Sequence, residues 1–321
     1  MSLQCSQKEK IMNNRQSRPT VDVIIPVYKP DRRLARLLSM LARQTLAPGR
    51  IIVMNTERSY WNEEGYRQIS NLEVHHVTKA EFDHGGTRNL GASYSDSEIM
   101  VFLTQDAVPA DEKLLEELVK PFSENDRVAA SYGRQLPDKD CGFVERYTRS
   151  FNYPAKDRIQ DAGSIETLGI KTFFCSNVCA AYKKNLFEQL GGFTDRAIFN
   201  EDMIYAGHAV KAGYAIAYCA EARVIHSHNY GCMQQFHRNF DLAVSQAEHP
   251  EVFGGIRSES EGIRLVKQTA GYLIGEGKWY LIPDLVVKSG FKYLGYRMGK
   301  CYRRLPRKVV LACTMNKEYW R

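Results

Sequence analysis

Asp106 stands just beyond an apolar run, residues 99–103, which has polar residues on both sides. Such a run is typical of a short strand that is buried on both faces of a sheet. In open α/β sheets, ligands bind at the carboxyl ends of strands. A carboxylate there can hold a divalent cation that in turn grips a diphosphate. The alternative is that Asp106 only forms the turn before Pro109.

Two acids and two histidines stand at the ends of other predicted elements. Glu201 and Asp202 begin an amphipathic helix. The dipole of a helix alone favours acids in its first turn, so a structural role at the helix start is one reading and a functional role the alternative. His226 and His228 follow a predicted strand, residues 214–225, and alternation along the chain puts them on one face. Such a pair can ligate a metal or can only form hydrogen bonds.

A glycine pair and an arginine lie in the segment 82–91. Gly85 and Gly86 allow the backbone to approach a ligand closely, and Thr87 can cap the helix that follows. Arg88 in the first turn is unfavourable for the helix dipole, so its position predicts an anionic partner. The alternative is a glycine-rich turn that carries a surface arginine.

The rest of the pattern predicts the elements that position these residues. Residues 21–28 form a first strand, Asp31 caps a helix that runs to Leu41, and a strand over 51–54 ends at Asn55. Strand, helix and strand at this spacing form a βαβ unit and predict a mostly parallel sheet flanked by helices. The further predicted elements are strands at 74–77 and 128–134, helices at 111–122 and 183–190, a strand or strand pair at 172–182, and a long irregular segment at 138–170.

Composition narrows the class of protein. The chain has 321 residues, of which 44% are apolar and 25% charged, which is typical of a globular enzyme. It has no apolar run long enough to span a membrane, and no apolar stretch precedes Val21, so we expect neither a transmembrane helix nor a secretory signal. Cys175 and Cys179 lie in an apolar stretch without a histidine at zinc-ligand spacing, which favours buried thiols in a cytoplasmic protein.

The positive charge is concentrated at the C-terminal end. Ten Lys or Arg residues and one Glu follow residue 285 and give +9, whereas the whole chain carries +7, so the rest sums to −2. Over residues 291–311, Tyr and Leu are interleaved with Lys and Arg. This pattern suits an amphipathic segment at an anionic membrane surface, or alternatively a solvated helix with a basic face. No nucleic-acid-binding motif accompanies the charge, so we do not expect a nucleic-acid partner.

Several of these features occur in an order that resembles a known family. They are Pro26-Val27-Tyr28, Asp106, Gly191-Gly192-Phe193, Glu201-Asp202, Gly213-Tyr214 and His226. Together they resemble family 2 glycosyltransferases of the GT-A fold over about residues 20–240. Residues 82–89 and 102–107 are similar to segments of the bacterial rhamnosyltransferases that build cell-surface polysaccharides.

The resemblance implies an inverting transfer from a nucleotide-diphospho-sugar, dTDP-L-rhamnose above all, to a hydroxyl of a growing glycan. It places Pro26, Val27 and Tyr28 at the nucleotide base, Arg88 near the diphosphate, Asp106 and His226 at Mg²⁺ or Mn²⁺, and Asp202, beside Glu201, as general base. Asn55, His84 and Gln105 join the donor site on the same grounds. An inverting displacement needs one base and neutralisation of the leaving diphosphate, which matches this set.

The resemblance also implies an organisation of the chain. We expect a disordered tail over 1–20, a GT-A catalytic domain over 21–245, and a helical, basic region over 246–321. Within the catalytic domain, 21–135 is the nucleotide-sugar half and 136–245 the acceptor half. A lipid-linked acceptor would place the enzyme in the cytoplasm, peripheral on the inner face of the cell membrane. The sequence leaves a homo-oligomer open.

Two departures from the family pattern leave alternatives open. Asn55 stands where the family has an Asp, and the metal motif reads Thr104-Gln105-Asp106 with only its last acid. A metal-independent transfer assisted by Arg88 and His226, a transferase for a UDP-linked galactose or N-acetylhexosamine, and a non-catalytic nucleotide-sugar-binding scaffold therefore remain. A sugar nucleotidyltransferase is excluded because no Gly-rich basic loop follows the first strand.

Overall fold

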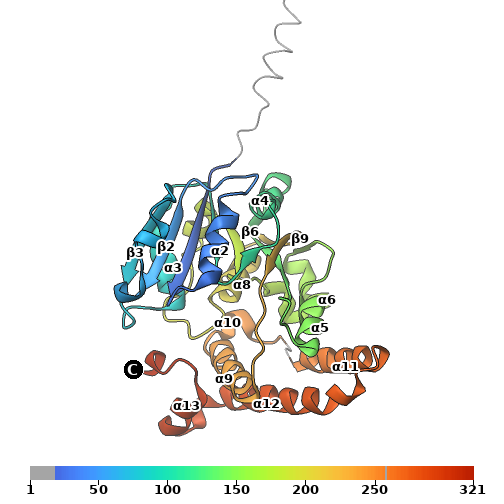
Figure 1. The fold of residues 1–321 in the computed structure, drawn as a ribbon. Helices are drawn as coiled ribbons and strands as arrows, with labels where there is room; N and C mark the ends of the chain where they lie inside the picture. Colours follow the sequence, from blue (N-terminus) through green and yellow to red (C-terminus); the bar gives the residue numbers. More distant parts are fainter. Residues whose placement is uncertain (1–18, 257–258) are drawn as a thin grey trace, which may run out of the picture.

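The computed structural model describes residues 19–256 and 259–321 (Figure 1). The predicted disordered tail, residues 1–20, lies almost wholly outside the described residues. The described chain forms one mixed sheet with helices on both faces, and further helices pack below the sheet in the view of Figure 1. This architecture confirms the predicted α/β fold class.

The sheet has nine strands among the described residues. Their order is β3-β2-β1-β4-β8-β6-β9-β5, and β7 also pairs with β9. The strands are β1 (Val21–Tyr28), β2 (Ile51–Thr56), β3 (Leu72–Val77), β4 (Ile99–Leu103), β5 (Val108–Pro109), β6 (Val128–Leu136), β7 (Arg158–Gln160), β8 (Cys179–Lys183) and β9 (Ala215–Ile225). β8 is antiparallel to both of its neighbours, β4 and β6, which are therefore parallel to each other. As a result six strands run in one direction, namely β1, β2, β3, β4, β6 and β9.

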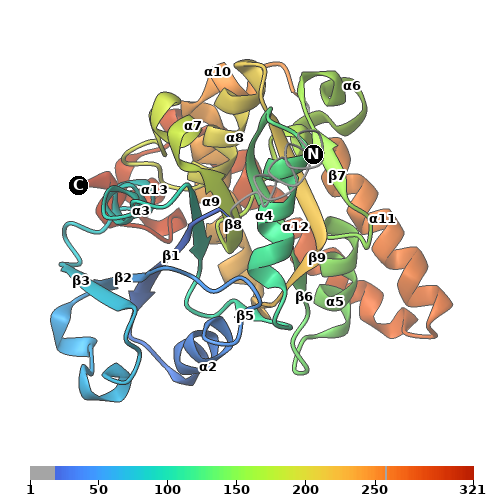
Figure 2. The same cartoon turned by 90° about the horizontal axis from the view of Figure 1, so that it is seen from above.

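Apolar cores cover both faces of the sheet. Alternate residues of β1 show why its sequence is mostly apolar: Ile24 belongs to one core, and Val23 and Ile25 belong to the other. One core is closed by the leucines of α2 (Arg32–Leu41) and α4 (Leu114–Glu124). The other is closed by α3 (His84–Ser93), α7 (Lys184–Gln189) and α8 (Glu201–Lys211). Figure 2 shows these layers from above.

Three local predictions need correction. Helix α3 is capped by Asp83, whose carboxylate accepts the Gly86 amide at 2.6 Å, so Thr87 is not the cap. Gly85 lies against the Thr194 backbone rather than being left open for a ligand. Residues 138–170 contain α5 (Phe143–Asn152), β7 and α6 (Ile165–Leu168), and the predicted strand at 172–182 begins only at Cys179, after the 3₁₀ turn η4 (Gly169–Phe173).

The C-terminal part of the chain is helical, as predicted. It comprises α9 (Cys232–Glu248), α10 (Pro250–Phe253), α11 (Glu259–Gly275), α12 (Ile282–Lys300) and α13 (Arg307–Cys313). Helix α12 lies along α9 so closely that a Cβ atom at Gly295 would clash with the Phe236 carbonyl oxygen. Several aromatic and aliphatic residues from the predicted amphipathic segment 291–311 pack into this helical cluster instead of facing outward. None of the helices in the described ranges is both long and apolar enough to cross a membrane.

Candidate active site

Asp106, His226 and His228 converge at the carboxyl ends of β4 and β9. The short strand β5 pairs antiparallel with the end of β9 and so draws the turn after β4 toward the two histidines. The Nε2 atoms of His226 and His228 lie 3.6 and 3.3 Å from the Asp106 carboxylate oxygens. The ligand atoms of the three residues all lie within 4.8 Å of one another. The predicted proximity of Asp106 and His226 is present, and His228 completes the cluster.

The histidines are held in the form that binds metals. Burial lowers the pKa of His226 to about 3, although the Asp106 carboxylate acts in the opposite direction, and burial also lowers the pKa of His228. The Nδ1 atom of His226 lies 3.0 Å from the Gln135 Oε1 atom, an acceptor, so Nδ1 carries the proton. The Nε2 lone pair of His226 therefore points toward Asp106 and toward Nε2 of His228, 3.0 Å away. A carboxylate and two neutral imidazoles form a donor set that a divalent cation fits.

A positive charge already lies near this cluster. The Arg33 guanidinium is 3.7 Å from the Asp106 carboxylate and 2.8 Å from that of Asp31. Arg33 is half exposed, so its side chain can turn away without leaving a buried charge unpaired.

The second acidic centre lies at the start of α8. The Asp202 carboxylate accepts the backbone amides of Asn177 at 2.9 Å and of Met203 at 2.8 Å. Glu201 pairs with the buried Arg88 guanidinium at 3.2 Å and also accepts the Asn177 side-chain amide at 3.2 Å. Arg88 therefore has the anionic partner that its position predicts, but this partner is Glu201.

The two neighbouring carboxyl groups have different pKa values. Burial, together with the adjacent negative charge of Glu201, raises the pKa of Asp202 to about 7. Burial acts in the same sense on Glu201, but the Arg88 charge and other favourable contacts outweigh it and hold the pKa of Glu201 below its usual value. At neutral pH Glu201 is ionised, and Asp202 is poised to exchange a proton.

Polar side chains connect the two centres. The amide nitrogen of Gln135, on β6, donates to the Ser176 hydroxyl at 3.1 Å, and Ser176 precedes Asn177, which binds both acids. Arg149, from α5, donates to the same Gln135 oxygen that faces His226. Gln135, Asn177 and Arg149 were not among the residues predicted from sequence. Gln135 and Asn177 lie within or beside predicted strands whose pairing the pattern does not reveal, and Arg149 lies in the segment 138–170, which has no clear periodicity.

A further cation missed by the sequence analysis is Arg238, on α9. Its guanidinium lies over the Phe199 ring at 4.7 Å and the Tyr230 ring at 5.5 Å. Its charge is one of those that lower the pKa of both His226 and His228, so it faces the same site. Its only signal in the sequence is its place on the helix that follows the histidine pair.

The residues predicted at the nucleotide differ in exposure. Tyr28 is 41% exposed, packs edge-on against Tyr60 at 5.6 Å, and lies near the Lys29 ammonium. Its backbone N–H and C=O are both bound by the Gln105 side-chain amide at 2.8 and 3.1 Å. Pro26 is partly buried, whereas the Val27 side chain is in the core.

Asn55 and His84 are turned toward the protein. Asn55 is fully buried, donates to the Glu57 carbonyl at 3.0 Å, and lies 3.0 Å from a ring nitrogen of His76. Its side-chain oxygen is buried without a hydrogen-bond partner. Burial lowers the pKa of His84, whose ring packs against Phe82.

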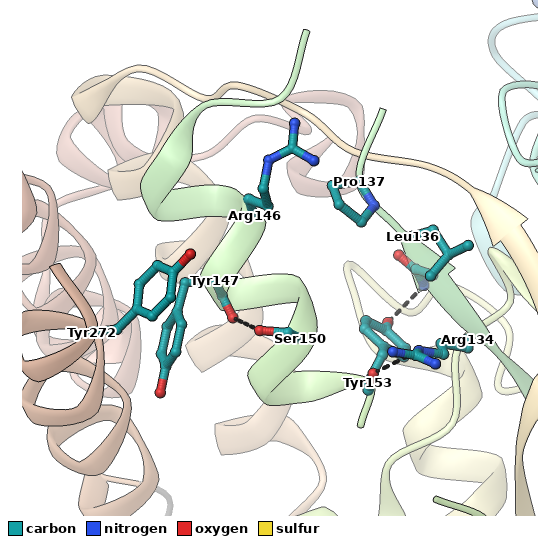
Figure 3. A pocket seen from close by; sticks show the side chains of 9 residues that line it. Arg134, Leu136, Pro137, Arg146, Tyr147, Ser150, Tyr153 and Tyr272 are labelled. Atoms are coloured by element: carbon teal, nitrogen blue, oxygen red, sulfur yellow. Dashed lines mark hydrogen bonds between the residues drawn. The ribbon is translucent and has the colours of Figure 1, made fainter. Parts of the chain in front are cut away.

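A cavity of about 280 Å³ opens beside the site, between the end of β6, α5 and α11 (Figure 3). Gln135 and Tyr153, which bond to each other at 2.6 Å, form part of its wall and join it to the histidine centre. On the opposite wall Tyr272 stacks on Tyr147 at 4.5 Å, and Arg146 lies at the rim. Partly exposed aromatic rings beside cations and hydroxyl groups suit a sugar ring.

A mixed sheet with an antiparallel strand inserted after β4, a carboxylate at the end of β4 and an acid at the start of α8 define a nucleotide-sugar transferase of the GT-A type. Residues 22–191 match glycosyl transferase family 2. The chain belongs to this family, and the protein is a glycosyltransferase.

Its similarity to curated proteins extends over nearly the whole chain. It is 38% identical over 304 residues to the O-antigen chain rhamnosyltransferase RfbN of Salmonella typhimurium. It is also 38% identical over 310 residues to the O-antigen chain rhamnosyltransferase WbaN of Salmonella anatum, and each match covers 94% of this chain and 96% of the relative. Among solved structures, the mannosyltransferase PcManGT from Pyrobaculum calidifontis, in complex with GDP-Man and Mn²⁺, has a similar fold. Its TM-score is 0.63 at 15% identity, covering 94% of this chain and 95% of that one.

Proposed function

We propose that the protein transfers L-rhamnose from dTDP-L-rhamnose to a hydroxyl of a growing cell-surface polysaccharide, with inversion at the anomeric carbon. The full-length similarity to two O-antigen chain rhamnosyltransferases supports the sugar and the polymer. The geometry supports the reaction type. The single observation that carries the proposal is that the site has two distinct acidic centres. One is Asp202, a carboxyl group with a pKa of about 7, and the other is a carboxylate–imidazole cluster that suits a cation.

Asp202 acts as the general base in this proposal. It accepts the proton of the acceptor hydroxyl while the hydroxyl oxygen bonds to the anomeric carbon, and the bond from that carbon to the diphosphate breaks with its electron pair leaving on the diphosphate. Asn177 and Met203 hold both carboxylate oxygens, so the base is preorganised. Glu201 and Arg88 act as positioning residues, since they contact each other and set the charge around Asp202.

Asp106, His226 and His228 would hold the divalent cation. A bound cation supplies charge neutralisation for the leaving diphosphate. Two imidazoles beside one carboxylate suit Mn²⁺ better than Mg²⁺, which prefers oxygen ligands throughout. The structurally similar PcManGT was solved with Mn²⁺. Arg238 and Arg149 add positive charge on the same side, which supports binding of the departing dianion.

On the donor side, Tyr28 and Pro26 form the surface for the nucleotide base, and the Gln105 side chain fixes the backbone of Tyr28. Asn55 holds the loop after β2 through Glu57 instead of touching the base directly, because its side chain is fully buried. His84 is the first residue of α3 and packs against Phe82, and Val27 contributes through its backbone only.

The cavity between β6, α5 and α11 receives the acceptor glycan. It adjoins Gln135, and through Ser176 and Asn177 it lies on the path to the base. The acceptor is carried on a lipid, and the basic C-terminal region holds the enzyme against the inner face of the cell membrane through its net positive charge.

The first experiment measures binding of dTDP and UDP by calorimetry, each with and without Mn²⁺, and then transfer from dTDP-L-rhamnose, UDP-galactose and UDP-N-acetylglucosamine. We expect dTDP to bind more tightly, binding to strengthen with Mn²⁺, and rhamnose alone to be transferred. Asp202→Asn should lower transfer by a factor of about 10² to 10⁴ while leaving dTDP binding nearly unchanged. Tighter binding of UDP would assign a UDP-sugar donor, and full transfer by the variant would remove Asp202 as base.

A further inference from the structure

The outward face of α12 is apolar where a helix exposed to water is usually polar. Val286 and Val287 are 57% and 51% exposed, and Tyr293 and Leu294 are 58% and 53% exposed. Val286 and Tyr293 are seven residues apart, as are Val287 and Leu294, which is about two helical turns, so they lie on one face of the helix. Gly290, the other exposed position between Val286 and Leu294, is uncharged. Trp279 and Tyr280, in the 3₁₀ turn η5 (Trp279–Leu281) directly before α12, continue the same spacing and are 68% and 56% exposed.

This surface, which we call the α12 outer face, consists of Trp279, Tyr280, Val286, Val287, Tyr293 and Leu294. The described part of the chain has fourteen exposed large apolar side chains, and six of them lie in this one short segment. Such a concentration marks an interaction surface, because isolated exposed apolar residues are normal but contiguous ones are not.

Helix α12 cannot rotate about its axis to bury the α12 outer face. On the opposite side of α12, Leu285 and Gly295 are buried, and Gly299 approaches α9 so closely that a Cβ atom would clash with the Phe240 carbonyl oxygen. Figure 1 shows α12 running along α9 at the lower edge of the molecule. The inner side of the helix is therefore fixed against the protein, and the apolar side stays outward.

We propose that the α12 outer face inserts into the interfacial region of an anionic lipid bilayer and thereby positions the active site next to the membrane surface. The segment 278–300 carries five Lys or Arg residues against one Asp, so its charge complements an anionic surface. Trp and Tyr at the start of the face and a second Tyr along it match the aromatic preference of membrane interfaces. A helix of this length, about 28 Å, that cannot span a bilayer lies in its plane.

A second copy of the chain fits this face less well. A twofold contact would set the same basic segment of one copy against that of the other, which brings like charges together. The bilayer has the opposite charge and has no such conflict. The inner side of α12 also carries Lys292, which lies among the charges of Arg149 and Arg238. The bilayer contact thus lies one helix away from the site that the proposed function assigns to a lipid-linked acceptor. The proposed membrane contact rests on the proposed function only where it concerns the position of this acceptor.

The test is co-sedimentation of the full-length protein with vesicles of phosphatidylcholine alone and of phosphatidylcholine mixed with phosphatidylglycerol. We expect binding to the anionic vesicles, weakening with salt, and a loss of about tenfold or more in the Val286→Gln/Val287→Gln variant. A second variant, Trp279→Ser/Tyr280→Ser, changes the turn instead of the helix and should show the same loss, which guards against misfolding of either variant. Ile159→Gln, on β7 and 45% exposed, is the matched control and should bind as the wild type does.

Equal vesicle binding by all variants, or no binding by the wild type, would overturn the proposal. So would a wild-type dimer that both variants convert to a monomer without any vesicle binding, since the occupant would then be a second copy. Transfer to a water-soluble acceptor should be unchanged in both variants. A loss of vesicle binding with transfer intact would support the surface, whereas a wild type that binds vesicles but transfers no sugar would refute only the proposed function.

Discussion

The rate of transfer should depend on pH through Asp202, and Glu201→Gln should move that dependence. A base works in its deprotonated form, so kcat/KM should fall about tenfold for each pH unit below the pKa of Asp202, about 7, and level off above it. The metal-site residue His226 has its pKa near 3 and does not titrate in this range. The midpoint near neutral pH therefore reports on Asp202.

The size of the shift follows from the causes of the raised pKa. The ordinary pKa of an aspartate is 3.8, so a pKa of about 7 corresponds to about 4 kcal/mol in favour of the protonated form. Burial is the larger cause and the Glu201 charge the next. For two carboxylates bonded to the same residue, Asn177, repulsion at an effective dielectric constant of about 20 is about 2 kcal/mol. Glu201→Gln should thus lower the midpoint by about 1 to 1.5 pH units.

The assay is kcat/KM for the donor across the pH range, for the wild type, Glu201→Gln and Asp241→Asn. Asp241 is a suitable control because it is also a buried carboxyl group, held by Thr314 and Met315 away from Asp202, and its pKa is raised to about 6. Asp241→Asn should leave the midpoint in place. An unchanged midpoint in Glu201→Gln, or a rate that rises as the pH falls, would refute the coupling of the two acids.

Three further results should follow from the structure. His228→Ala should weaken Mn²⁺ binding about 10- to 100-fold, measured by calorimetry; unchanged affinity would exclude it as a ligand. Gly295→Ala should lower the free energy of unfolding by about 1–3 kcal/mol, measured by denaturant titration, because the new methyl group would clash with the Phe236 carbonyl oxygen, whereas Gly290→Ala, on the open side of the same helix, should not. Burial raises the pKa of Asp241, so its protonated form is favoured in the folded state and its contribution to stability is lost as the pH rises from about 4 through 6. Asp241→Asn should remove that loss, and equal slopes of stability against pH in both proteins would contradict it.

Much of the sheet and part of the site could be predicted from sequence. The strands β1, β2 and β4 are mostly apolar because both faces are buried, and polar residues stand at or just beyond their carboxyl ends. Since parallel strands present their carboxyl ends at one edge, Asp106 and His226 could be expected to meet there. The two-residue strand β5, which brings them together, carries no periodic signal of its own.

The contacts that determine the charge states of the acids and histidines in the site could not be predicted in the same way. An arginine in a first helical turn predicts an anionic partner, and the family resemblance places Arg88 near the diphosphate, but its partner in the structure is Glu201, from the distant helix α8. Gln135 determines the tautomer of His226, and Asn177 binds both neighbouring acids at the start of α8. Gln135 and Asn177 lie beside β8, an antiparallel strand inserted into a sheet that the βαβ pattern predicts as parallel.

The pairing of Arg88 with Glu201 explains how one short helix start supplies two acids with different tasks. A buried arginine keeps Glu201 ionised, and the ionised Glu201 disfavours a second negative charge at Asp202. Asp202 is thereby a stronger base than an ordinary aspartate while it remains preorganised by two backbone amides. If this reasoning is right, Arg88 acts on catalysis without touching the substrate. Arg88→Met should then change the pH midpoint of transfer more than it changes the KM of the donor, and a rise in donor KM with an unmoved midpoint would return Arg88 to the diphosphate.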